Sequence, residues 1–206
     1  MAGPTLQTSA FILGRAPTGS DSFEQLPVFS AAEGLLLCLR RQSTKTAGQT
    51  TPLDLFDEAE LWLESSNQGR TWFIKEHRHI ARHPGIGRSY AALQAAASLA
   101  RLIQRNPVPD ESRAPVAALL RQSFHALDAG HRPDLVWLKA LFCFLRDEGY
   151  PVKQQWWQQL DAGDRILATQ LLNQPLAGQD PDAVLVRHLT RRLTDWTARD
   201  TELRVE

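Results

Sequence analysis

The sequence is poor in the residues that build disulfide or metal frameworks, because its 206 residues include only two cysteines, Cys38 and Cys143. A structural zinc site needs about four thiolate or imidazole ligands, so two distant thiols exclude a cysteine-based zinc knuckle and a disulfide scaffold. Each cysteine lies within an apolar run. This setting predicts two buried thiols in a reducing compartment.

A net charge is also missing, since 23 Lys and Arg residues balance 23 Asp and Glu residues. DNA-binding proteins usually carry a basic excess, because neutralising phosphates and releasing counterions supplies much of their affinity. Any nucleic-acid site in this chain therefore has to depend on a local cluster of cations.

Signals for membranes and for catalysis are absent as well. The N-terminus shows no charged leader followed by an apolar core, and no apolar run approaches membrane-spanning length. The sequence contains no Gly-rich phosphate loop, no Gly-x-Ser-x-Gly elbow and no His-Glu-x-x-His motif. We therefore expect a cytoplasmic protein that is not an enzyme, needs no cofactor and does not associate with membranes.

Residues 21–41 show the clearest local pattern. Apolar runs at 23–29 and 35–39 have the length of strands, and Gly34 supplies the positive φ that a tight reversal needs. The pattern predicts a buried hairpin that delivers Arg40, Arg41 and Lys45 to a loop beside a sheet.

The rest of the first 82 residues also reads as strands. Residues 6–13 and 71–82 are rich in β-forming residues, and residues 42–52 form a polar linker. Residues 55–64 alternate, which predicts a half-buried strand whose acidic outer face carries Glu58, Glu60 and Glu64. A turn at residues 67–69 joins the last two strands. About five short strands predict a small closed barrel.

After Pro84 the apolar residues recur every three to four positions, which is the helical period. Helices are expected at 89–103, with Tyr90, Leu93, Ala97 and Leu102 on the packed face, at 112–129 and 133–148, and in shorter pieces at 153–160 and 164–172. Asp180 is the expected cap of a last helix with Leu185, Leu189, Leu193 and Trp196 on one side. The predicted fold class is α+β, with a β-barrel domain at 1–83 and an α-helical bundle at 84–206.

Two groups of cations are candidate DNA-binding residues on the barrel. Arg40, Arg41 and Lys45, with Arg15, would contact phosphates, and Phe23 or Trp72 would stack on bases. The alternative is an ordinary solvated loop. The second group has the same two interpretations and consists of Lys75, Arg78 and Arg82, with Arg88 nearby.

Three histidines accompany this second group. His77 and His79 would share one face of a strand, a spacing that some zinc sites use, but His83 is a doubtful third ligand. A basic strand end without metal is therefore the default expectation.

In the helical part, Lys139 lies in the most apolar helix and Arg146 follows two turns later. A cation beside an apolar groove suits a partner's tail of acidic and aromatic residues, since the groove takes the aromatic ring and the cation takes the terminal carboxylate. The alternative is a lysine that snorkels at the wet edge of its helix. Trp156 and Trp157 are expected in the core.

Several ordered segments resemble the RecO family of bacterial recombination mediators. They are the Ser30-Ala31-Ala32-Glu33-Gly34 turn, the basic loop with Arg40, Arg41 and Lys45, the strand entry at 51–56, and the pair of segments 138–141 and 148–151. The resemblance covers about residues 6–160. Residues 152–157 depart from the family because they lack its Cys-x-x-Cys pair, and the basic loop is thinner than usual.

The resemblance implies an OB-fold for the barrel and a nucleoid-associated role in DNA repair. RecO-like proteins bind single- and double-stranded DNA through the barrel and anneal complementary strands. They also bind the acidic C-terminal tail of single-stranded DNA-binding protein and, with RecR, help load RecA. The alternative is a protein–protein adaptor on the same scaffold that has little affinity for DNA.

Overall fold

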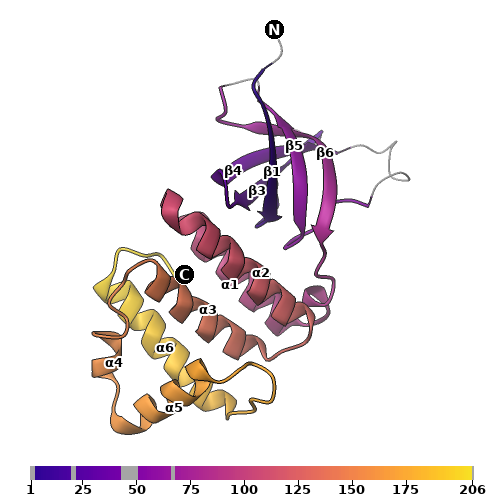
Figure 1. The fold of residues 1–206 in the computed structure, drawn as a ribbon. Helices are drawn as coiled ribbons and strands as arrows, with labels where there is room; N and C mark the ends of the chain where they lie inside the picture. Colours follow the sequence, from indigo (N-terminus) through magenta and orange to yellow (C-terminus); the bar gives the residue numbers. More distant parts are fainter. Residues whose placement is uncertain (1–2, 20–21, 43–50, 66–67, 206) are drawn as a thin grey trace. The chain divides into compact units, whose positions relative to one another are not determined.

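The structure is a computed structural model that describes residues 3–19, 22–42, 51–65 and 68–205 (Figure 1). Its contacts divide the chain into two compact units. The barrel unit comprises residues 1–83 and 108–117, and the helical unit comprises residues 84–107 and 118–206. Residues 108–117 thus group with the barrel and not with the residues that follow them. No helix in the described part of the chain has the length and apolar character needed to cross a membrane.

The barrel unit contains a sheet in the order β1-β5-β6-β4-β3-β2, and an additional pairing of β1 with β3 closes it. The strands are β1 (Thr5–Ile12), β2 (Ala16–Pro17), β3 (Phe23–Ser30), β4 (Gly34–Arg41), β5 (Glu58–Glu64) and β6 (Trp72–Ala81). Five of them form the closed barrel, and the two-residue β2 pairs only with β3. The OB-like barrel followed by helices that the sequence predicts is therefore confirmed.

Alternation along the strands fills the barrel with apolar side chains, because successive residues point to opposite faces of a sheet. The buried cluster consists of Ala10, Ile12, Leu26, Val28, Cys38, Leu53, Ala59, Leu61 and Leu63. Each of the larger members stabilises the fold by about 1.5–3 kcal/mol through the area it removes from water.

The predicted hairpin between β3 and β4 is also present. Gly34 has a φ of +73°, and a Cβ at this position would lie 2.8 Å from Nε of Arg113. Nη1 of the same arginine donates to the carbonyl of Ala32 at 3.1 Å. The positive φ therefore favours glycine at this turn, and the missing Cβ leaves room for the guanidinium group of Arg113.

The helical unit and its connections contain η1 (Ile86–Arg88), α1 (Tyr90–Arg105), η2 (Asp110–Ser112), α2 (Arg113–Asp128), α3 (Pro133–Asp147), α4 (Trp156–Gln159), α5 (Ala162–Asn173) and α6 (Ala183–Asp200). α3 contacts both α1 and α6. Eight of its residues are buried, which agrees with the central position that its apolar surface predicts.

The predicted packed face of α1 is wrong for two of its four residues, since Leu102 is buried and Ala97 is partly buried but Tyr90 and Leu93 are exposed. Tyr90 is 81% exposed and Leu93 is 37% exposed, whereas the buried stripe includes Ala92, Ala96 and Leu99. Small alanines let the helix approach α3 closely, so the alanine stripe is buried in preference to the larger side chains.

Two details of α6 also differ from the prediction. Asp182 caps the helix by accepting from the backbone N–H of Val184 at 2.7 Å, whereas Asp180 forms an ion pair with Arg132 at 3.1 Å. Leu185 is 44% exposed and Val186 is buried in its place.

The acidic outer face of β5 begins later than predicted. Glu58 is buried at 3% exposure, although it continues the alternation of β5 and pairs with Phe11 of β1. β4 is also less buried than predicted, and Leu35 is 47% exposed.

Candidate functional site

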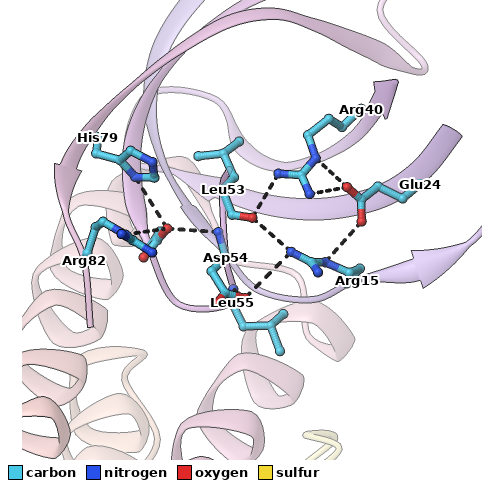
Figure 2. Close-up of polar contacts among 9 residues, drawn as sticks. Arg15, Glu24, Arg40, Leu53, Asp54, Leu55, His79 and Arg82 are labelled. Atoms are coloured by element: carbon cyan, nitrogen blue, oxygen red, sulfur yellow. Dashed lines mark hydrogen bonds and ion pairs between the residues drawn. The ribbon is translucent and has the colours of Figure 1, made fainter. Parts of the chain in front are cut away.

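Two of the predicted DNA-binding arginines converge on one buried carboxylate of the barrel unit. Glu24 is 4% exposed and forms an ion pair with Nε of Arg15 at 3.1 Å and with the guanidinium of Arg40 (Figure 2). Both guanidinium groups also donate to the carbonyl oxygen of Leu53 at 2.9 Å. The hairpin register pairs Glu24 with Arg40 directly, so the strand pairing itself places these charges together. They stabilise the barrel and are not available as free cations.

A second buried carboxylate of the barrel unit lies beside another predicted DNA-binding residue. Asp57 is 2% exposed, accepts from the backbone N–H of Asp54 at 2.9 Å, and lies 3.7 Å from Nε of Arg82. Nδ1 of His79 is 3.4 Å from the same carboxylate (Figure 2). The positive charge of Arg82 is therefore opposed by a nearby negative charge.

The remaining cations of the second predicted group lie on β6 opposite acidic residues of β5. Lys75 pairs with Glu64 at 2.8 Å, and Arg78 pairs with Glu60 at 2.5 Å. Hydrogen bonds from Gln7 and then from Arg78 lower the pKa of the Glu60 carboxyl, so it is ionised at neutral pH. Each of these two cations thus lies next to a carboxylate on the neighbouring strand, so they do not form a basic patch.

Arg41 differs from its neighbours because its side chain is exposed and makes no hydrogen bond or ion pair with the described residues. It pairs in register with Phe23, whose ring lies 5.8 Å from that of Phe73 in an edge-to-face arrangement. Phe73 pairs in turn with Leu39 of β4. Arg41, Phe23 and Phe73 thus form an outer face of β3, β4 and β6. Trp72, the other predicted stacking residue, packs against the barrel core, and Lys45 lies outside the described residues.

The three histidines do not converge on one point. Nε2 of His77 and Nε2 of His79 both hydrogen-bond to the carbonyl of Thr51, at 3.0 and 3.1 Å. His83 is buried and its Nδ1 hydrogen-bonds to the carbonyl of Phe56 at 3.0 Å. Within the part of the chain that the structure describes, no group of three or more His, Cys, Asp or Glu side chains could hold a metal ion.

Both predicted partner-binding residues line one pocket of the helical unit, with a volume of about 540 Å³. Its walls come from α2, α3, α5 and the segment around α4. The lining residues are Leu119, Gln122, Ser123, Val136, Lys139, Ala140, Phe142, Cys143, Arg146, Lys153, Trp157, Thr169, Leu172, Asn173 and Leu176. Among these described residues three are cationic and none is acidic. The pocket therefore combines apolar walls with positive charge.

The two predicted cations have structural partners within this pocket. Nζ of Lys139 donates to the carbonyls of Leu172 at 3.2 Å and Gln174 at 2.5 Å, where it caps the C-terminal end of α5. Burial lowers the pKa of this amine. Arg146 donates twice to Asp147, at 2.6 and 3.0 Å, and hydrogen bonding to Asp147 is the main reason that the pKa of Arg146 is raised.

Sequence reasoning missed Lys153 and Trp157. Lys153 is exposed and has no hydrogen bond or ion pair with any residue that the structure describes. Trp156 is buried as predicted, but Trp157 lines the pocket, so the core assignment is wrong for this residue. Four positions separate Lys153 from Trp157, so the predicted helix at 153–160 would already have placed both residues on one face. The helix itself begins only at Trp156.

The cysteines differ in their surroundings. Cys38 belongs to the barrel core, and burial raises the pKa of its thiol to about 12. Cys143 is only partly buried and lines the helical pocket, which corrects the prediction that both thiols are buried. Burial also raises the pKa of Cys143.

Comparison with protein-family models gives no match, and comparison with curated protein sequences gives none either.

Proposed function

We propose that this chain is a recombination mediator of the RecO type that docks on the acidic C-terminal tail of single-stranded DNA-binding protein. The observation that carries the proposal is the helical pocket, in which Lys139, Arg146 and Lys153 surround apolar walls without an acidic residue among the described lining. The mediator would also bind and anneal DNA and, with RecR, help load RecA. These further roles follow from the resemblance of the sequence to the family.

The chemistry of the pocket suits a peptide that ends in an aromatic residue and carries several carboxylates. Phe142, Trp157 and Leu176 offer apolar contacts for the ring of that residue. A terminal carboxylate requires N–H donors that carry positive charge, and such charge-assisted hydrogen bonds are about twice as strong as neutral ones.

The contacts of the three cations suggest a different role for each of them. Lys139 already caps α5 through its contacts with Leu172 and Gln174, so its main effect on a ligand is its charge. Arg146 is held in position by Asp147. Lys153 has no partner among the described residues and is our candidate for direct contact with the carboxylate.

The outer face of the barrel supports a part in binding single-stranded DNA. Phe23 and Phe73 offer rings for base stacking, and Arg41 offers a free guanidinium for a phosphate. This is the face of an OB barrel that commonly binds oligonucleotides.

The test is a fluorescence-anisotropy titration of the full chain with a labelled acidic peptide that ends in phenylalanine. We expect micromolar binding that weakens as salt is raised, and binding about fivefold weaker for Lys153→Ala. The same peptide with a C-terminal carboxamide should bind more weakly than the free acid.

Arg88→Ala is the matched control, because Arg88 is an exposed arginine of the same unit that lies outside the described lining of the pocket. Binding that is equally strong for the carboxamide peptide, or that Lys153→Ala leaves unchanged, would contradict the proposed docking.

The second candidate function is a protein–protein adaptor with little affinity for DNA. The observation that favours it is the opposition of Arg15, Arg40, Lys75, Arg78 and Arg82 by carboxylates. An adaptor would bind the acidic peptide and show no salt-dependent binding of an oligonucleotide. The same titration with a labelled oligothymidylate therefore separates the two functions.

A further inference from the structure

The helical unit carries a second groove, which lies over α3 between α1 and α6. Two adjoining cavities of about 780 and 450 Å³ share Ser98 of α1, Trp137 of α3 and Thr194 of α6. Because the same three residues line both cavities, the two adjoin, and together they are called the α1–α3–α6 groove. Trp137 is half-buried and forms part of its floor. α3 contacts both α1 and α6 (Figure 1).

Arginines follow both walls of this groove. α1 contributes Arg101 and Arg105, and α6 contributes Arg187 and Arg191. All four are exposed. The side chains of Arg105 and Arg187 make no hydrogen bond or ion pair with the described residues.

The other two arginines are only weakly engaged. Arg101 donates to the hydroxyl of Ser98 at 3.2 Å, and Arg191 lies 3.7 Å from Asp195 in an exposed pair. An exposed ion pair of this kind contributes about 0–1 kcal/mol, so a phosphate can replace the carboxylate at little cost.

Two acidic residues line the groove, and each has a cation beside it. Asp134 accepts from Arg132 at 2.7 Å, and Asp195 faces Arg191. The four arginines therefore leave the described lining with a net positive charge. This distinguishes the groove from the barrel surface, where carboxylates oppose the predicted cations.

The length of the groove along α1 suits an extended polyanion. Ala91, Ser98 and Arg105 line one side of α1, and the helix rises about 21 Å between the first and the last. That length corresponds to about six stacked nucleotides at 3.4 Å each. Arginine along a groove with an aromatic ring in its floor is the arrangement that single-stranded nucleic acid requires, since phosphates need cations and bases need a flat ring.

We propose that the α1–α3–α6 groove binds the backbone of single-stranded nucleic acid, with Trp137 in contact with a base. This inference rests on the proposed function, because it assigns part of the DNA binding of a recombination mediator to the helical unit. It also supplies the phosphate contacts that are scarce on the barrel, where Arg41 is the one predicted and described DNA-binding residue without a partner.

The experiment is an anisotropy titration of a fluorescein-labelled oligothymidylate with the full chain at several salt concentrations. Arg105→Ala/Arg187→Ala removes two exposed charges, and we expect its affinity at low salt to fall on the order of tenfold. The salt slope should become shallower by about 1.4, because each phosphate contact on a single strand contributes about 0.7. When the salt concentration rises fourfold, the factor by which affinity falls should therefore be about seven times smaller for the variant than for the parent chain.

Two further variants make the result specific. Arg187→Ala is compared with Arg70→Ala, an exposed arginine of the barrel unit that also has no partner among the described residues, and only the groove variant should weaken binding. Trp137→Phe keeps a ring in the floor, so affinity should change less than about threefold while the quenching of tryptophan fluorescence by the oligonucleotide is reduced.

Equal effects of Arg187→Ala and Arg70→Ala would overturn the inference. So would a loss of binding with Arg41→Ala while Arg105→Ala/Arg187→Ala binds normally, because the barrel face would then be the DNA site. If the groove variant lost affinity for the acidic peptide and not for the oligonucleotide, the groove would be a peptide site and the inference would be wrong. A chain that binds the oligonucleotide through the groove but not the acidic peptide would support this inference and contradict the proposed docking.

Discussion

Replacing Arg40 by alanine should destabilise the barrel unit strongly, although the sequence suggests a surface residue that contacts DNA. Arg40 is one of two arginines that neutralise Glu24, whose side chain is 6% exposed. Without it, the carboxylate keeps only Arg15 at 3.1 Å, and that side chain is 41% exposed. Removing one partner of a buried ion pair costs about 3–5 kcal/mol, and the remaining arginine reduces this to about 3 kcal/mol. The carbonyl of Leu53 keeps its hydrogen bond from Arg15, so it adds little.

The assay is urea unfolding followed by tryptophan fluorescence, which includes Trp62 and Trp72 of the barrel unit. With a dependence of about 2 kcal/mol per molar urea, a loss of about 3 kcal/mol lowers the midpoint by about 1.5 M. Arg41→Ala is the control. Arg41 is the next residue of β4, exposed and without a partner among the described residues, so its removal should change stability by less than about 0.5 kcal/mol.

The reasoning would be refuted if Arg40→Ala and Arg41→Ala unfolded at the same urea concentration. A double variant, Glu24→Gln/Arg40→Met, gives a second check. Because it removes both charges together, it should recover most of the stability that Arg40→Ala loses. The same result matters for DNA binding, since a loss of affinity in an Arg40 variant would reflect an unstable barrel as much as a missing phosphate contact.

Three other outcomes follow from the structure. Asn106→Ala should lower the free energy of unfolding by about 2 kcal/mol. The reason is that the buried amide donates to the carbonyls of Leu102 and Arg204 and accepts from the N–H of Arg204. Thermal unfolding measures this loss, and an unchanged midpoint would contradict it. Hydrogen bonds from Gln7 and Arg78 lower the folded-state pKa of Glu60. The stability that this carboxylate gives the fold is therefore present above the unfolded pKa of 4.5 and is lost as pH falls through the folded pKa. Glu60→Gln should flatten the acid limb of a curve of unfolding free energy against pH. Lys139→Met should lower the free energy of opening the C-terminal end of α5 by on the order of 1 kcal/mol, because it removes the hydrogen bonds to Leu172 and Gln174. Hydrogen exchange of the last amides of α5 would detect the change. Unchanged protection of these amides would count against the capping role.

Much of the fold could be predicted because local signals agreed with it. Alternating residues and the turn at Gly34 indicated the barrel strands, and Ser89 marked the start of α1 by accepting from the N–H of Ala92 at 3.3 Å. Local signals failed where a residue distant in the sequence determines which side of an element is buried or which groups pair. The alanine stripe of α1 is buried only because α3 lies against it, and Asp180 pairs with an arginine 48 residues earlier in the chain.

The candidate sites depend even more on long-range partners. Arg40 reads as a free cation in sequence, yet the hairpin register places it opposite Glu24, and Arg82 lies beside an aspartate 25 positions earlier. Lys139 and Arg146 could be placed near an apolar groove because both lie on one strongly apolar helix. Lys153 and Trp157 could not, since no local signal shows which helices the segment around α4 packs against.

The most direct test of the account follows the indole N–H resonances of the six tryptophans while the acidic, phenylalanine-ended peptide is added to the ¹⁵N-labelled chain. Trp157 lines the helical pocket, whereas Trp62 and Trp72 belong to the barrel unit. We predict that the Trp157 resonance, assigned by Trp157→Phe, shifts and saturates with the peptide and that the barrel resonances stay in place. A saturating shift of Trp62 or Trp72 with an unmoved Trp157 would contradict the account.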